Sequence, residues 1–311
     1  MSVQSVPLSA MFAWVINGFK LVGKRFTSQL GACALFLLLI LVVCVPMWGV
    51  MFFVMGNSIQ GGLPMGQSPL AGNIPLFVGM YALTAVISMA LFPPMVVGWF
   101  RLCRGIDRGD AVGAMSVLSP FSDRALWLRS IGFAALAFVI YMAFFGLMAL
   151  AFYGTIADVM HQVQAQQAAA LTGAPPTPPH FPASFFLAYF LMIAVGSFLQ
   201  FVYMIGFADV ALQGTGAVDA LMRAVQGTFK NLIKLLIFTV CMFVVAMVVF
   251  FLFALVLGIV AALLMVIMKS LAFVLMAVFE IVLMLCIYPL MFSINYFAWK
   301  SMLGEEPAIA A

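Results

Sequence analysis

Charged residues are scarce in this sequence. Lys and Arg total 13 and Asp and Glu total 9 among 311 residues, so charge makes up 7% of the chain, against roughly 25% in soluble globular domains. Hydrophobic residues reach 67%. A soluble fold of this size would have too few charges to cover its surface. The composition therefore excludes a soluble globular domain and predicts a polytopic membrane protein.

Motifs of conventional enzymes are also missing from the sequence. It contains no Gly-rich phosphate loop, no HExxH, no GxSxG and no paired catalytic carboxylates. We therefore expect a non-enzymatic protein without a cofactor, and no feature predicts nucleic-acid binding. Asp158, His161 and His180 are too few convergent ligands to predict a metal site.

The cysteines form no CxxC pair, and all five lie in or at the ends of apolar runs. We expect buried, inert thiols. A cleavable signal is missing too, because the basic residues near the N-terminus precede a long apolar run with no A-x-A site. This first apolar run is expected to remain as a membrane helix.

Six apolar runs are long enough to cross a bilayer, which takes roughly 20 helical residues. They lie at about 29–55, 75–102, 126–156, 184–210, 232–257 and 274–299. Within lipid each backbone polar group must be satisfied inside its own segment, so these runs are predicted to be helices. The expected fold is an all-α membrane protein with six transmembrane helices.

Two connections between these runs allow further predictions. Residues 162–182 are rich in Gln and Ala and then in Pro, which suits a frayed helix end that runs into an extended loop. Residues 258–273 stay apolar except for Lys269 and Ser270. Either the last two helices are long and tilted, or a short segment lies in the outer interface.

Basic residues lie almost entirely on one side of this arrangement. The stretch from Arg101 to Arg129 alone holds five arginines, whereas the connection 56–73 has no charge. Twelve of the 13 basic residues fall on the same side, and only Lys269 falls on the other. Lys and Arg concentrate in cytoplasmic loops, so both termini are predicted to be cytoplasmic.

Three segments on the predicted cytoplasmic side share a layout. Each begins with a short amphipathic stretch and continues with Phe, one residue and a small polar residue before a membrane helix. The polar residues are Ser28, Asp123 and Asn231, all of types preferred as helix N-caps. The layout predicts three short interfacial helices. It also indicates three parallel units of two membrane helices each, at about 8–108, 109–214 and 215–303.

Several short motifs resemble those of a known group of proteins. They are Trp14-x-x-x-Gly18-Phe19, Pro94-x-x-x-Gly98, the turn from Arg104 to Asp110, and the Phe121 segment. Together they resemble a loose group of bacterial six-helix membrane proteins of unknown function. That group is similar to the YciC-type inner-membrane proteins and to the membrane module that accompanies bacterial glycerophosphodiester phosphodiesterases. The resemblance implies a bacterial inner-membrane location and supplies no catalytic residues.

Glu280 is the only acidic residue well inside an apolar run. Ionisable groups in membrane helices often mark an ion or substrate path. Pro93 and Pro289 each lie about ten residues from an expected cytoplasmic helix end, where a proline kinks the helix and frees a carbonyl. Together the three residues suggest a small-solute transporter or channel. The alternative is that Glu280 reaches outer water, because its 20-residue separation from Lys300 corresponds to about 30 Å of helix.

Arg101, Arg104 and Arg108 share one helix face, at i, i+3 and i+7. Either they only set the topology, or they contact anionic lipid headgroups, at about 1 kcal/mol for each basic residue. Asp209, near the end of the fourth run, either pairs with a nearby Arg or Lys or binds a substrate. The first functional hypothesis is a non-enzymatic inner-membrane protein that organises or handles lipid, with membrane lipids as its partners. The transporter is the second.

Overall fold

A computed structural model describes residues 3–60, 74–172, 181–267 and 269–304. Within these ranges the chain is helical, with no strand. The long helices are α2 (Phe26–Gln60), α3 (Ile74–Arg108), α4 (Arg124–Ala151), α6 (Ala183–Gln213), α8 (Leu232–Ile267) and α9 (Lys269–Leu303). Six stretches within them are long and apolar enough to cross a membrane: Phe26–Gly49, Val78–Arg108, Arg124–Ala151, Ala183–Gln213, Leu232–Val256 and Val278–Leu303. The predicted all-α fold with six candidate spans is confirmed.

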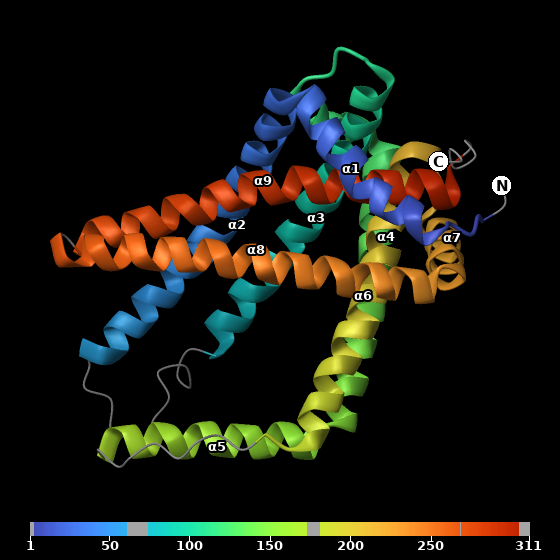
Figure 1. The fold of residues 1–311 in the computed structure, drawn as a ribbon. Helices are drawn as coiled ribbons and strands as arrows, with labels where there is room; N and C mark the ends of the chain where they lie inside the picture. Colours follow the sequence, from blue (N-terminus) through green and yellow to red (C-terminus); the bar gives the residue numbers. More distant parts are fainter. Residues whose placement is uncertain (1–2, 61–73, 173–180, 268, 305–311) are drawn as a thin grey trace.

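A shorter helix precedes the first long helix of each pair. They are α1 (Leu8–Lys24) before α2, the 3-10 helix η2 (Ala114–Ser122) before α4, and α7 (Ala217–Lys230) before α8. Each of the three expected units therefore holds one short helix and two long ones. The second unit also contains α5 (Tyr153–Thr172), which runs crosswise from the end of α4 (Figure 1).

Consecutive long helices form three pairs, α2 with α3, α4 with α6 and α8 with α9, and α3 also packs against α4, α6 and α9. The three pairs spread apart from one common end, where α1, η2 and α7 also lie (Figure 1). We call this end the junction. It consists of the three short helices and the adjoining ends of the long ones, in particular the C-terminal ends of α3, α6 and α9.

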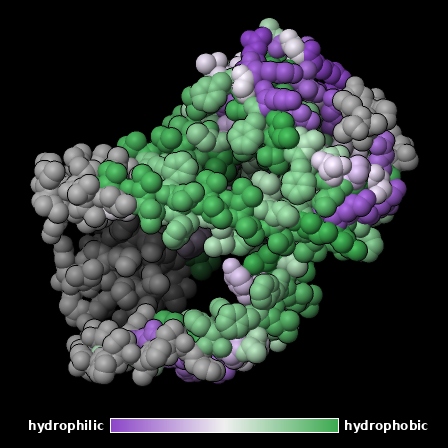
Figure 2. All heavy atoms as spheres, viewed as in Figure 1, coloured by the Kyte–Doolittle hydropathy of each residue, from purple (hydrophilic) through white to green (hydrophobic). Residues whose placement is uncertain are grey.

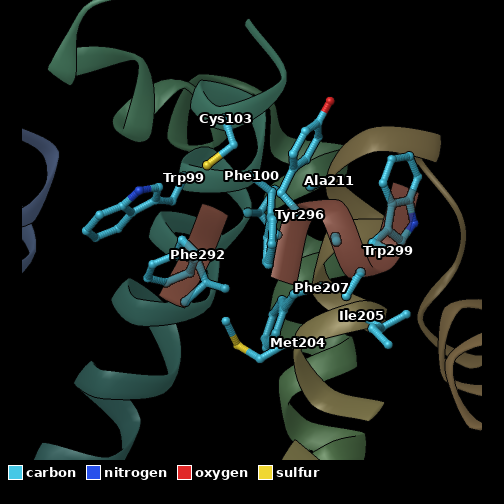
Figure 3. Close-up of a cluster of buried hydrophobic side chains, with 14 of the residues drawn as sticks. Trp99, Phe100, Cys103, Met204, Ile205, Phe207, Ala211, Phe292, Tyr296 and Trp299 are labelled. Carbon is cyan, nitrogen blue, oxygen red and sulfur yellow. The ribbon is translucent and has the colours of Figure 1, made fainter. Parts of the chain in front are cut away.

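Most of the buried side chains lie in or next to the junction. The rings of Trp99 and Phe292 stack at 4.2 Å, with 12° between their planes (Figure 3). Phe36 meets the ring of Trp99 edge-on. Because α2, α3 and α9 each contribute one of these rings, aromatic packing is a main contact among the three helices.

Gly98 allows η2 to pack closely against α3. A Cβ atom at this position would collide with the backbone carbonyl of Val117. Small residues let helix backbones approach in this way in membrane proteins. The glycine of the Pro94-x-x-x-Gly98 motif therefore has a packing role at the junction.

The N-cap prediction holds at one of its three positions. The Asp123 carboxylate accepts a hydrogen bond from the backbone N–H of Leu126 at 3.1 Å. Ser28 instead lies inside α2, and its hydroxyl donates to the carbonyl of Val112. Asn231 lies between α7 and α8, but its side-chain oxygen accepts from the N–H of Val6 at 2.8 Å. The predicted caps at Ser28 and Asn231 are wrong, because these side chains bind partners distant in the sequence instead.

The connections differ in part from expectation. The third run ends earlier than expected, at Ala151, and after a bend at Phe152 the chain continues as α5. The first part of the segment 162–182, expected to be a frayed helix end, is helical as far as Thr172. Between α8 and α9 the long-helix alternative is correct, since helix continues to Ile267 and resumes at Lys269. The 36 residues of α8 extend over about 54 Å, well beyond about 30 Å of hydrocarbon. The uncharged residues 61–73, His180 and the side chain of Lys269 lie outside the described part of the chain.

Candidate functional site at the junction

The C-terminal end of α6 receives polar contacts from several other helices of the junction. The last four carbonyls of an α-helix have no partner within the helix. Here α6 ends at Gln213, and Gly214 follows with a left-handed φ of 67°, a conformation that favours glycine. The chain therefore needs donors from elsewhere to satisfy these carbonyls.

Arginines of two other helices supply those donors. From α3, Arg101 Nε donates to the Ala211 carbonyl at 3.3 Å and Arg104 Nη1 donates to the Leu212 carbonyl at 2.8 Å. From α4, Arg129 Nη1 donates to the Gly214 carbonyl at 2.6 Å. Positive charge at a helix C-terminus is also favoured by the helix dipole. The arginines thus fasten α3 and α4 to the end of α6.

The three arginines predicted to act as one face therefore have different surroundings. Arg101 and Arg104 are half-buried against α6. Arg108, at the last position of α3, is exposed and has no hydrogen bond or ion pair with the described residues. Two of the three side chains thus have a role inside the protein that neither sequence hypothesis included. Only Arg108 is left fully available to an outside ligand.

Asp209 is fully buried near the end of α6. Its Oδ1 accepts from the Trp299 indole at 3.1 Å, and its Oδ2 accepts from the Thr215 hydroxyl at 3.0 Å. Arg223 Nη1 lies 3.3 Å from Oδ2, so the expected pairing with a nearby base is present. A buried charge is costly unless it is paired and hydrogen-bonded. The carboxylate therefore holds α7 and α9 against α6.

Asp107 joins α3 to α9 in a similar way. Its Oδ2 accepts from the Tyr296 hydroxyl at 2.9 Å and lies 3.0 Å from Lys300 Nζ. In Figure 3 the Tyr296 hydroxyl points out of the buried aromatic cluster. Asp107 and Tyr296 are not among the functional residues predicted from the sequence. Tyr296 and Lys300 lie 189 and 193 residues from Asp107 in the sequence, and no local pattern indicates that they meet it.

A recess opens between these contacts, with a volume of about 150 Å³. We call it the junction recess. It is lined by Arg104, Asp107, Arg108, Gln213, Tyr296, Trp299, Lys300 and Gly304. Three of these side chains are cationic and one is a carboxylate, so the lining carries net positive charge. This is the clearest candidate site in the described part of the chain.

The three residues suggested for a solute path do not line a common site. Pro93 and Pro289 are buried, and the adjacent rings of Phe92 and Tyr288 both contact Phe36. Glu280, in contrast, is exposed on α9. The two prolines therefore belong to the packed core, and Glu280 does not share that environment.

Other expected features can also be located. Asp158 and His161 are exposed on α5, and no three His, Cys, Asp or Glu side chains among the described residues are placed to hold a metal ion. The expectation of buried thiols is correct for Cys33 and Cys103, whereas Cys286 is exposed.

In the described part of the chain, six helices are long and apolar enough to cross a membrane, and hydrophilic side chains gather over the junction (Figure 2), as in a multi-pass helical membrane protein. Comparison with protein-family models, with curated proteins and with solved structures finds no match for this chain.

Proposed function

We propose that this chain is a non-enzymatic protein of the bacterial inner membrane that organises or handles membrane lipid. In this proposal both termini are cytoplasmic, and α1, η2 and α7 lie at the cytoplasmic interface. The short helix and two long helices of each unit would be three parallel copies of one design. The resemblance to the YciC-type proteins is part of the same proposal.

The exposure of α8 is the observation that carries the proposal. Seven consecutive side chains, Met247 to Phe253, are each at least 47% exposed. Seven residues cover nearly two helical turns and so point in all directions around the helix. In a membrane, acyl chains would surround this part of α8, including the side that faces α4 and α6.

The spread of the helix pairs supports the same conclusion. Apolar surface follows α8 and α9 and continues along α4 and α6, with open space between the two pairs (Figure 2). A bundle built to carry a polar solute would bring its helices together around polar side chains. Here the polar side chains are concentrated at the junction, and the space between the pairs has apolar walls suited to lipid.

The solute-path alternative has weaker support. Its two prolines are packed in the core, and Glu280 is exposed at the surface of α9. From Lys300 to Glu280 the helix rises about 30 Å, close to the thickness of the hydrocarbon layer. Glu280 would then reach the opposite interface, where a carboxylate needs no pathway to explain it.

Native mass spectrometry of the full chain tests the lipid proposal. The protein is extracted in mild detergent, washed extensively and released from the micelle in the gas phase. We expect phospholipid to remain bound after washing. If the protein carries no lipid, the proposal fails.

A second measurement tests the solute path. Ser293 is fully buried one turn from Pro289, so Ser293→Cys in a background without the native cysteines reports water access to this part of the core. We expect no labelling by a membrane-impermeant maleimide in the folded protein. Rapid labelling would instead support a water-filled path.

A further inference from the structure

We propose that the junction recess binds a phosphomonoester group, which is a compact dianion. The site itself is inferred from its geometry and charge, whereas the choice of a lipid headgroup as the source of the phosphate rests on the proposed lipid function. The same chemistry is offered by soluble phosphomonoesters, and the experiment below separates the two sources.

The charge balance of the recess favours an anion of about two negative charges. Among the described residues that line the recess, Arg104, Arg108 and Lys300 face one carboxylate, that of Asp107. The nearby carboxylate of Asp209 is already paired with Arg223 behind the Trp299 indole. Phosphomonoesters carry between −1.5 and −2 charges near neutral pH, whereas the phosphodiester of an ordinary phospholipid carries one.

Hydrogen-bond donors are available in the recess. Arg108 is exposed and donates to no described residue. Arg104 uses Nη1 for the Leu212 carbonyl, and a guanidinium has five N–H donors in total. The planar fork of arginine suits the geometry of phosphate oxygens and permits two parallel hydrogen bonds. The side-chain amide of Gln213 adds a further donor in the lining.

The size and position of the recess also fit a phosphate group. Its volume of about 150 Å³ leaves room for a phosphate group, which has five heavy atoms. Arg108 and Gln213 are the last residues of α3 and α6, and Gly304 directly follows α9. If these helices cross the membrane, the recess lies at the depth of the lipid headgroups, where basic pockets between helix ends bind anionic lipids.

The test uses the full chain in detergent, titrated by native mass spectrometry with phosphatidic acid, a phosphomonoester lipid. Phosphatidylglycerol with the same acyl chains serves as the phosphodiester comparison. We expect phosphatidic acid to bind more tightly, and Arg108→Gln to weaken it at least tenfold. Arg108→Lys, which keeps the charge and loses the fork, should weaken it less.

The matched control is Arg25→Gln, which removes the same charge from an exposed position outside the recess lining. Its binding of phosphatidic acid should stay within twofold of the wild type. Equal losses in Arg25→Gln and Arg108→Gln would show a general charge effect and overturn the proposed site. So would equal binding of the phosphomonoester and phosphodiester lipids.

A parallel titration with glycerol 3-phosphate identifies the source of the phosphate. Binding of the lipid alone supports a headgroup site. If glycerol 3-phosphate binds and Arg108→Gln abolishes this binding, the ligand is a soluble phosphomonoester. If the purified protein also carries no lipid, the lipid function is refuted and the site stands. If phosphatidic acid or phosphatidylglycerol stays bound and Arg108→Gln does not weaken its binding, the proposed site is refuted and the lipid function stands.

Discussion

The indole N–H of Trp127 on α4 donates a hydrogen bond to the backbone carbonyl of Ala90 on α3, at 3.2 Å. In an unbroken helix this carbonyl would accept from the residue four positions later, which is Pro94. Proline has no N–H, so α3 cannot satisfy the carbonyl by itself. Trp127 supplies the missing donor and thereby ties the proline-containing part of α3 to α4.

Trp127→Phe should therefore destabilise the protein by about 1 kcal/mol, because it leaves the part-buried carbonyl of Ala90 without its donor. Pro94→Ala restores a backbone N–H, so Trp127→Phe should cost less in that background. Thermal unfolding in detergent measures both values. Trp48→Phe, at an exposed position, is the control and should have little effect. Equal costs of Trp127→Phe in the two backgrounds would refute this role.

The arginines of α3 should separate into two classes by their effect on stability. Arg101→Gln and Arg104→Gln each remove a charged donor from an α6 carbonyl, a loss of about 1.5–3 kcal/mol. Arg108→Gln should change stability by less than about 0.5 kcal/mol, as is usual for surface positions. Chemical denaturation of the three variants gives the comparison. Equal losses of stability in the three variants would contradict this division, and would fit side chains that only set the topology.

Gly98→Ala should be markedly unfavourable, because its Cβ would collide with the Val117 backbone and displace η2. Gly79→Ala on the same helix is the matched control, since a Cβ there meets nothing within 4 Å. Alanine is favoured over glycine in a helix by about 1 kcal/mol. Gly79→Ala should therefore be neutral or stabilising, and opposite shifts in unfolding temperature are expected. Similar shifts would contradict the close packing of α3 on η2.

Asn231 fastens the N-terminal segment to the junction. Its side-chain amide accepts from the Val6 N–H and donates to the carbonyls of Gln4 and Gly227. Asn231→Ala should release residues 3–7, so that limited proteolysis removes them much faster than from the wild type. Asn17→Ala, at a half-buried position on α1, should leave the cleavage rate unchanged. Unaltered protection in Asn231→Ala would show that other contacts hold the segment.

The sequence was sufficient to predict the six spans, because membrane helices must be long and apolar along their own length. The cap at Asp123 was also predictable, since its partner Leu126 lies three residues away. Both features depend on neighbours in the chain. The long-helix alternative for 258–273 was recognised but not selected, because length and composition fitted both alternatives.

The polar contacts of the junction were beyond such reasoning. Arg104 and its acceptor Leu212 are 108 residues apart, and Trp299 and Asp209 are 90 residues apart. Arginines in a connection are expected for topology alone, which conceals their second role at the end of α6. That Asp209 pairs with a basic residue was predictable, since a buried carboxylate needs a partner. That this residue is Arg223 was not predictable.

In the proposed topology all three helix pairs cross the membrane from one charged junction. Reporter fusions at residues 115 and 170 test this most directly, because Met115 lies in η2 at the junction and residue 170 lies in α5, beyond the far end of α4. We predict cytoplasmic activity for the fusion at 115 and activity on the opposite side for the fusion at 170. Reporters that are active in the same compartment would contradict the account.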